Sequence, residues 1–163
     1  MQNKLIKLSR EILQICDKNK ITISSAESCT GGLISQYFTS HPGSSKVFLG
    51  GFVTYSNNSK IKILNVKEET LKNYGAVSEN TVIEMSEAAK IILNTDISLA
   101  VSGIAGPDGG SKDKPVGLVH HCVSNLENKN IHRKIIHVGN REDIRNKTAE
   151  TIFDMILEQI LQI

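Results

Sequence analysis

The stretch ITISSAESCTGGLISQYF, residues 21–38, carries the signals of a strand, a tight turn and a helix in direct succession. Residues 21–26 are β-branched and alternating, which is typical of a short strand. The six residues Glu27-Ser-Cys-Thr-Gly-Gly32 are mostly small or polar, and from Leu33 to Phe38 apolar residues recur at helical spacing. A strand that turns directly into a helix is the first part of a βαβ unit, so this stretch predicts an α/β protein.

The rest of the chain continues this alternation in both directions. Further strands are predicted at residues 47–55, 97–104, 116–124 and 131–138. Helices are predicted at residues 4–17, 57–66, 68–74 and 78–93, and in a last segment capped by Asn140. The last two strands are joined by a short polar turn and predict an antiparallel hairpin. We therefore expect a three-layer α/β/α sandwich with a mixed sheet of about five strands.

Length and composition indicate an ordinary globular protein. The chain has 163 residues, so we expect a single domain over residues 1–163. The net charge is +2 and aromatic residues make up 4%, which argues against a nucleic-acid-binding surface. The longest run of apolar residues and glycine, 47–53, is far shorter than the roughly 20 residues of a membrane-spanning helix. The first ten residues do not resemble a signal peptide, so we expect a cytoplasmic protein without a membrane partner.

The cysteines and histidines do not form a recognisable metal site. Cys16, Cys29 and Cys122 lack the spacing of a zinc site and are odd in number, which argues against a disulfide framework. His120 and His121 are adjacent, and neighbouring strand residues point to opposite faces of a sheet. We therefore expect no metal and no cofactor. Cys29 lies at the start of a predicted helix and is one candidate nucleophile, although no histidine lies near it in sequence.

Two loops follow strands that we expect to be parallel, at residues 27–32 and 103–115. The first brings hydroxyl groups to the start of a helix, where free N–H groups favour an anion such as phosphate. The same residues are equally consistent with a simple helix cap. The second contains four of the 12 glycines, spaced as neither a Walker loop nor a dinucleotide fingerprint. Both loops are candidate binding loops.

A third cluster contains a serine, a tyrosine and a lysine that together can form a nucleophile with its base. Ser45 lies in the turn before the predicted strand 47–55, Tyr55 ends that strand, and Lys60 follows it. A serine hydroxyl needs a base, and lysine can act as one if its environment lowers its pKa to about 7 to 8. The spacing alone also fits three residues without a shared chemical role, namely a serine in a turn, a tyrosine in a strand and a lysine on the surface.

Six strings of residues then identify a resemblance. They occur in this order along the chain: Ala26-Glu-Ser-Cys-Thr-Gly-Gly32, Pro42-Gly-Ser-Ser45, Gly50-Gly-Phe-Val-Thr-Tyr-Ser-Asn-Asn-Ser-Lys60, Gly75-Ala-Val-Ser-Glu79, Ser102-Gly-Ile-Ala-Gly-Pro-Asp-Gly-Gly110 and Lys114-Pro-Val-Gly117. Together they resemble the CinA carboxyl-terminal domain family, the nicotinamide-nucleotide amidohydrolases, over about residues 5–160. The chain looks like the stand-alone form of that family.

The resemblance implies hydrolysis of the carboxamide of nicotinamide mononucleotide to nicotinate mononucleotide and ammonia, in pyridine nucleotide recycling. It implies no metal or other cofactor, and it implies a homodimer. It also implies Ser45 as nucleophile, Tyr55 as its hydrogen-bonding partner and Lys60 as general base. The substrate-binding residues that it implies are Ser28, Thr30, Gly31, Ser102, Gly106, and Arg141 or Arg145.

Several alternatives stay open at this point. Either Arg141 or Arg145 contacts the substrate phosphate, for which a guanidinium is well suited. Glu27 either balances the cationic pyridinium or caps the following helix. The oxyanion donors are backbone N–H groups around residues 44–45 or 50–51. A non-catalytic nucleotide-binding or regulatory module of the same fold is the alternative function, since fold alone does not establish activity.

Overall fold

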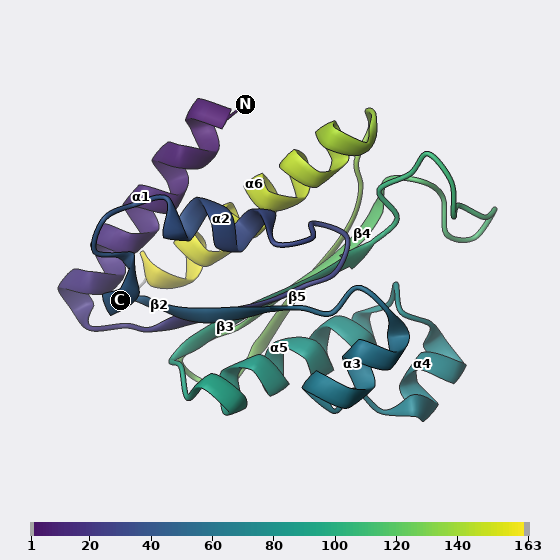
Figure 1. Cartoon of the computed structure of the whole chain (residues 1–163), viewed down its shortest axis with the longest axis horizontal. Coiled ribbons are helices and arrows are strands. Elements are labelled where there is room, and N and C mark those ends of the chain that lie inside the picture. The colour runs from purple at the N-terminus through teal and green to yellow at the C-terminus, as the bar shows by residue number, and fades with distance from the viewer. Residues whose placement is uncertain (1, 162–163) are drawn as a thin grey trace.

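The computed structural model describes residues 2–161 and is drawn in Figure 1, where a mixed sheet forms the middle layer. Its five strands lie in the order β2-β1-β3-β4-β5. They are β1 (Ile23–Glu27), β2 (Phe48–Val53), β3 (Ile97–Gly103), β4 (Leu118–Ser124) and β5 (Asn130–Ile136). β1 pairs in parallel with β2 and β3, whereas β4 is antiparallel to both β3 and β5.

Helices cover both faces of the sheet, as Figure 1 shows. On one face lie α1 (Gln2–Asn19), α2 (Leu33–Thr39) and α6 (Arg141–Ile160), and on the other lie α3 (Asn57–Leu64), α4 (Glu68–Tyr74) and α5 (Glu79–Leu93). A short 3-10 helix, η1 (Ser44–Lys46), precedes β2. The prediction of a three-layer α/β/α sandwich with a mixed sheet of about five strands is confirmed. No helix within residues 2–161 is long and apolar enough to cross a membrane.

Each helical layer packs its own apolar core against the sheet. On the α1, α2 and α6 side, the Phe38 ring stacks on Phe48 and meets Phe153 edge-on, with both centroid distances at 5.1 Å. On the α5 side, Met85 belongs to a buried cluster that includes Cys122 of β4. Since β1 and β3 have a helical layer on both sides, almost all of their residues are buried.

Local signals place the ends of the helices. The Asn140 side chain accepts from the backbone N–H of Asp143, and the Asp143 side chain accepts from the backbone N–H of Asn140, so α6 begins with a capping box. Ser78 caps α5 in the expected position by accepting from the N–H of Thr81. The predicted strand 116–124 begins two residues late because Gly117 has a φ of +92°, a conformation that ends an extended strand.

The parallel part of the sheet positions the candidate site. β1, β2 and β3 run in the same direction, and Glu27 lies level with Val53 and Val101 in the register. The loops that follow the three strands therefore meet at one edge of the sheet. The carboxyl edge of parallel strands is where ligands bind in sheets of this kind.

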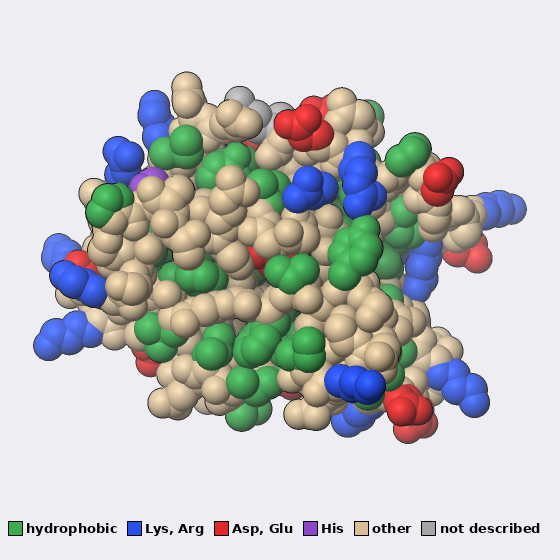
Figure 2. All heavy atoms as spheres, viewed as in Figure 1, with side chains coloured by type: hydrophobic (Ala, Val, Ile, Leu, Met, Phe, Trp, Pro, Cys, Tyr) green, Lys and Arg blue, Asp and Glu red, His purple; other side chains and the backbone are tan. Residues whose placement is uncertain are grey.

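The molecule presents β2 toward the viewer in Figures 1 and 2. Figure 2 shows mostly backbone, uncharged and hydrophobic side chains across the middle of this face. Lys, Arg, Asp and Glu side chains are concentrated around its rim.

Candidate active site

A small pocket lies at the carboxyl edge of the parallel strands, with a volume of about 160 Å³. Its lining residues come from the segments that follow β1 and β2, from the α4–α5 connection, from the end of β3 and its loop, and from the start of α6. They are Ser28, Cys29, Tyr55, Lys60, Ala76, Val77, Ser102, Gly103, Ala105 and Arg141. Residues that are far apart in the sequence therefore meet at one place.

The central contact of this pocket joins Lys60 to Ser28. The Lys60 Nζ donates to Ser28 Oγ at 2.9 Å and to the Thr54 carbonyl oxygen at 2.7 Å. Ser28 is held in place at the end of β1 because its own N–H donates to the Val101 carbonyl of β3 at 3.1 Å. The lysine is held by α3, whose first turn is closed by a capping box between Ser56 and Ser59.

The environment of Lys60 changes its acidity. Its side chain is only 1% exposed, and within residues 2–161 it has no ion pair with a carboxylate. Burial disfavours the charged form and lowers the pKa of Lys60 to about 8. A sizeable fraction of this amine is therefore neutral near pH 7 to 8. In the neutral form, its lone pair is available to accept the proton of the Ser28 hydroxyl.

Arg141 and Tyr55 form one side of the pocket. The guanidinium of Arg141 donates to the Tyr55 hydroxyl at 2.9 Å and to the Gly106 carbonyl oxygen at 2.7 Å. It therefore connects the segment after β2 with the loop after β3. Tyr55 is 62% exposed, so this pair lies where the pocket opens to solvent.

Arg145 has a different position. Its Nε and one terminal nitrogen donate to the Thr30 carbonyl oxygen, at 3.2 and 2.6 Å. It braces the turn after β1 and does not line the pocket. Of the two arginines proposed from the sequence, Arg141 is the one that lies at the pocket.

The Glu27 carboxylate caps α2 from inside the protein. It is completely buried and accepts five hydrogen bonds, from the Thr30 and Ser35 hydroxyls and from the backbone N–H groups of Gly32, Ile34 and Ser35. All of these distances lie between 2.6 and 3.2 Å. Of the two alternatives for Glu27, the structure therefore supports helix capping. Because the carboxylate occupies the N–H groups of Gly32, Ile34 and Ser35, these three donors are not open to a phosphate.

The other predicted binding residues are only partly brought together. Ser102 lines the pocket, and its hydroxyl donates to the Ala76 carbonyl oxygen at 2.7 Å, which fixes the opposite wall. Thr30 is fully buried beneath the turn, Gly31 lies exposed beside Arg145, and Gly106 contributes its carbonyl to Arg141. None of these last three lines the pocket.

Ser45 does not lie near Lys60 within the chain. It belongs to η1, before β2, whereas Tyr55 and Lys60 follow the other end of that strand. Six extended residues span roughly 20 Å at about 3.3 Å per residue. Within one copy of the chain, the structure therefore does not bring Ser45 together with Tyr55 and Lys60, and Ser28 is the serine that contacts Lys60.

The contact of Ser28 with Lys60 was missed at the sequence level, although Ser28 was among the predicted substrate-binding residues. One signal was available, because Ser28 and Lys60 each follow a strand that was expected to belong to the parallel part of the sheet. The carboxyl ends of neighbouring parallel strands meet at the same edge.

Cys29 is poorly suited to act as the nucleophile. It is 5% exposed, and burial raises the pKa of its thiol to about 12. The thiol is therefore protonated at neutral pH, whereas the thiolate is the reactive form. Within residues 2–161, no group of three or more His, Cys, Asp or Glu side chains could hold a metal ion.

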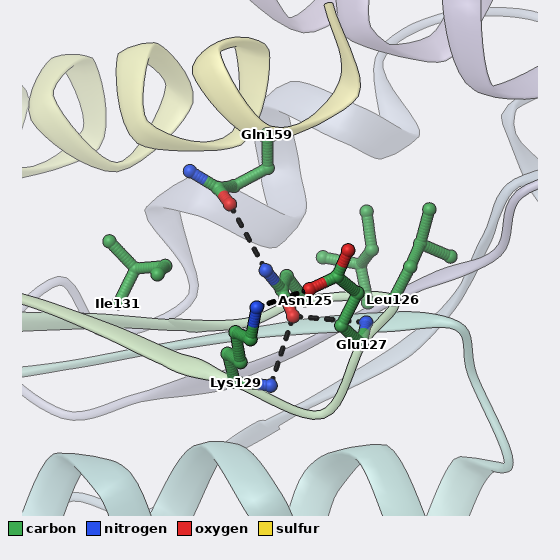
Figure 3. Close-up of a pocket in the computed structure, with 7 residues that line it drawn as sticks. Asn125, Leu126, Glu127, Lys129, Ile131 and Gln159 are labelled. Carbon is green, nitrogen blue, oxygen red and sulfur yellow. Dashed lines mark hydrogen bonds and ion pairs between the residues drawn. The ribbon is translucent and has the colours of Figure 1, made fainter. Parts of the chain in front are cut away.

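A larger cavity lies at the opposite ends of the strands from this pocket, at the turn between β4 and β5 (Figure 3). Its volume is about 460 Å³. Its polar groups bond mainly to one another. Asn125 donates to Gln159 at 3.2 Å and accepts from the N–H groups of Glu127 and Lys129 at 3.0 Å. These bonds form the turn itself. Because this cavity contains neither a nucleophile nor a buried base, the smaller pocket is the better candidate site.

Comparisons with known proteins identify the family of this chain. Residues 5–160 match the family described as the CinA C-terminal domain. A CinA-like protein of Fervidobacterium nodosum is 47% identical over 152 residues, which are 93% of this chain and 37% of that protein. A CinA-like protein of Thermosipho melanesiensis is 52% identical over 136 residues, which are 83% of this chain and 34% of that protein. The chain thus spans about a third of the length of these curated relatives.

Solved structures of this family share the fold over nearly the whole chain. The crystal structure of competence/damage inducible protein CihA from Agrobacterium tumefaciens has a TM-score of 0.93 and 39% identity, covering 95% of this chain and 94% of that one. The competence damage-inducible protein A from Klebsiella pneumoniae has the same TM-score at 29% identity, covering 96% and 97%. By sequence and by fold, this chain belongs to the CinA C-terminal domain family.

Proposed function

We propose that this chain is an amidohydrolase in which Ser28 is the nucleophile and Lys60 is the general base. The observation that carries the proposal is the 2.9 Å contact between the Ser28 hydroxyl and a buried lysine whose pKa is lowered to about 8. A nucleophile within hydrogen-bonding reach of a base with a suitable pKa is the arrangement that acyl transfer through serine requires.

The reaction proceeds in two stages at this pair. Neutral Lys60 takes the Ser28 proton while Oγ attacks the carboxamide carbon. The tetrahedral intermediate then loses its C–N bond, and the lysine returns the proton to the nitrogen, which leaves as ammonia. An ester with Ser28 remains. Water, deprotonated by neutral Lys60, attacks this ester, releases the carboxylic acid product and restores the serine.

We propose nicotinamide mononucleotide as the substrate. The resemblance to nicotinamide-nucleotide amidohydrolases supports this choice, and so does the size of the pocket. A volume of about 160 Å³ is below the roughly 300 Å³ of typical pockets for drug-sized ligands, so it suits one ring and its carboxamide. The ribose and phosphate would then extend past Tyr55, where Arg141, an exposed residue, carries a guanidinium that suits a phosphate dianion. Because a phosphorylated nucleotide does not cross membranes freely, we expect the protein in the cytoplasm.

The test is an assay of ammonia release from nicotinamide mononucleotide, with free nicotinamide and NAD as comparison substrates. We expect turnover of the mononucleotide, at least about 10³-fold slower turnover in Ser28→Ala, and less than about tenfold loss in Ser45→Ala. Circular dichroism controls for folding. Equal or greater loss in Ser45→Ala would return the nucleophile to Ser45. Binding of the mononucleotide without any ammonia release would instead favour a non-catalytic nucleotide-binding module.

A further inference from the structure

The segment between α4 and α5 forms one wall of the pocket, through Ala76 and Val77. The four successive carbonyl oxygens of residues 74–77 all accept hydrogen bonds from side chains, at 2.6 to 2.8 Å. Each of these bonds ties one peptide unit of the segment to a side chain outside it. The position of this wall therefore depends on the side chains that hold it.

A single residue holds two of the four carbonyl groups. The Nζ of Lys114 donates to the Tyr74 carbonyl oxygen at 2.6 Å and to the Val77 carbonyl oxygen at 2.8 Å. The carbonyl groups between them, of Gly75 and Ala76, accept from the hydroxyl groups of Ser78, Thr81 and Ser102. Among the residues that the structure describes, Lys114 makes no ion pair with a carboxylate. The wall is thus the main partner of its ammonium group.

An ammonium group suits this position because it carries three donors at one point. Two carbonyl oxygens that converge from residues three positions apart can therefore share it. Gly75 lies between these residues with a φ of +79°, a conformation that favours glycine. A Cβ at this position would lie 3.0 Å from the Lys114 Nζ, so a larger residue would crowd the ammonium.

Lys114 is itself held in the loop between β3 and β4. The Ser111 N–H donates to the Lys114 carbonyl oxygen at 2.8 Å, and the Lys114 N–H donates to the Ser111 hydroxyl at 3.1 Å. Three residues later, the N–H of Gly117 donates to the Ile104 carbonyl oxygen at 2.8 Å and closes the loop. The lysine therefore joins a fixed part of this loop to the segment before α5.

We propose that Lys114 is a positioning residue, which holds the Ala76–Val77 wall against the ring of the bound substrate. Since the ring enters this pocket only as part of the proposed reaction, the role of Lys114 rests on the proposed function. The pocket has a volume of about 160 Å³, so movement of one wall changes how the carboxamide lies at the Ser28 Oγ. Lys114 does not line the pocket and acts through the wall alone.

The mobility of the wall tests this role without any substrate, so its outcome is independent of the proposed function. Lys114→Met removes the ammonium group and keeps most of the side-chain volume. The ¹⁵N order parameters of residues 75–78 should fall from about 0.85, the value of rigid backbone, to below about 0.6. The matched control is Lys72→Met, because Lys72 is an exposed lysine on α4 close to the wall in sequence. Unchanged order parameters in Lys114→Met, or an equal fall in Lys72→Met, would overturn the proposal.

Kinetics then test whether the wall orients the substrate. The kcat of Lys114→Met should fall at least about tenfold, because misplacing a substrate by about 1 Å costs on the order of 10²-fold. The loss should be the same for nicotinamide mononucleotide and nicotinamide riboside, since both place the same ring at the wall. A loss confined to the mononucleotide would make Lys114 a phosphate ligand, and an unchanged kcat would show that the wall does not orient the ring. Either result would overturn the proposal.

Chemical rescue separates positioning from a general loss of structure, and it applies even if Lys114→Met does not fold. In Lys114→Cys, the thiolate displaces bromide from 2-bromoethylamine and gains an aminoethyl group of nearly the length of lysine. Wild-type protein should not react, because Cys16, Cys29 and Cys122 are all buried. Alkylation should return both the order parameters and kcat to within about threefold of the wild type. An alkylated protein that stays as impaired as the unmodified variant would contradict the role of the ammonium group.

Discussion

The Nζ of Lys60 lies 2.9 Å from the Oγ of Ser28, although 32 positions separate the two residues in the sequence. The parallel pairing of β1 and β2 makes this possible, because both residues follow the carboxyl ends of neighbouring strands. The hydrocarbon stem of the lysine is covered by protein, and its amine is left with a hydroxyl and a carbonyl as partners. A buried amine without a carboxylate is costly for stability, and such costs are common at functional sites.

The first prediction concerns the pH dependence of turnover. Because the base must be neutral, kcat/KM should rise with pH through about 8 and then level off, following the lowered pKa of Lys60. Lys60→Met, which keeps most of the side-chain volume, should lose at least about 10²-fold in kcat, since general-base catalysis contributes roughly 10²–10⁴-fold. Steady-state rates between pH 6 and 10 measure both effects. A profile that is flat across this range would contradict the role of Lys60 as base.

The second prediction concerns stability. The pKa of Lys60 is about 8 in the folded protein and 10.5 in its ordinary state, so the unfolded chain binds more protons between these values. The full free-energy cost of burying the charged amine is therefore present below pH 8. This cost falls as the pH rises toward 10.5. Removing the amine in Lys60→Met should raise the free energy of unfolding at pH 7 by up to about 3 kcal/mol.

Urea unfolding of the wild type and Lys60→Met at pH 7 and pH 10 measures this difference. The gain from the substitution should shrink at the higher pH. Lys62→Met, an exposed lysine on the same helix, is the matched control and should change stability little. A Lys60→Met protein that is less stable than the wild type at pH 7 would show that the two hydrogen bonds of the amine outweigh its desolvation.

The third prediction concerns Glu27, whose carboxylate accepts five hydrogen bonds at the start of α2. Glu27→Gln replaces one acceptor oxygen by a donor that faces other donors. The lost charged hydrogen bonds should lower the free energy of unfolding by about 2 to 4 kcal/mol. Thermal unfolding measures this loss.

Since Glu27 does not reach the pocket, the KM of the folded Glu27→Gln protein for nicotinamide mononucleotide should stay within about twofold of the wild type. A large rise in KM with unchanged stability would show that the carboxylate balances the pyridinium instead. The matched control for an exposed carboxylate is Glu11→Gln on α1, which should alter neither quantity.

The arrangement of strands and helices could be predicted from the sequence because it depends on local patterns. Alternating and continuous apolar runs marked the strands, and Ser78 and Asn140 marked the starts of α5 and α6. The site was harder to predict. Ser45 is closer than Ser28 to Lys60 in sequence, but β2 separates Ser45 from Lys60 and the sheet brings Ser28 to it. The spacing of residues along the chain does not show which of them lie at the same end of the strands in the folded sheet.

The same limit applies to the turn after β1. Its hydroxyls and glycines fit an anion site and a helix cap equally well as a sequence pattern. The three-dimensional structure supports the helix cap, because the Glu27 carboxylate accepts from the N–H groups of Gly32, Ile34 and Ser35 at the start of α2.

The fourth prediction separates the two arginines. Arg141 lies at the pocket and holds the Tyr55 hydroxyl, whereas Arg145 holds the Thr30 carbonyl oxygen behind it. Arg141→Ala should therefore raise KM for nicotinamide mononucleotide by at least about tenfold, because a charge-assisted bond to phosphate is worth roughly 1.5–3 kcal/mol. Its effect on nicotinamide riboside, which lacks the phosphate, should be less than about threefold. Arg145→Ala should instead lower thermal stability and affect both substrates equally. Steady-state kinetics on the two substrates, together with thermal unfolding of each variant, give these values. If Arg141→Ala impairs the riboside as much as the mononucleotide, the arginine positions Tyr55 and Gly106 and does not bind phosphate.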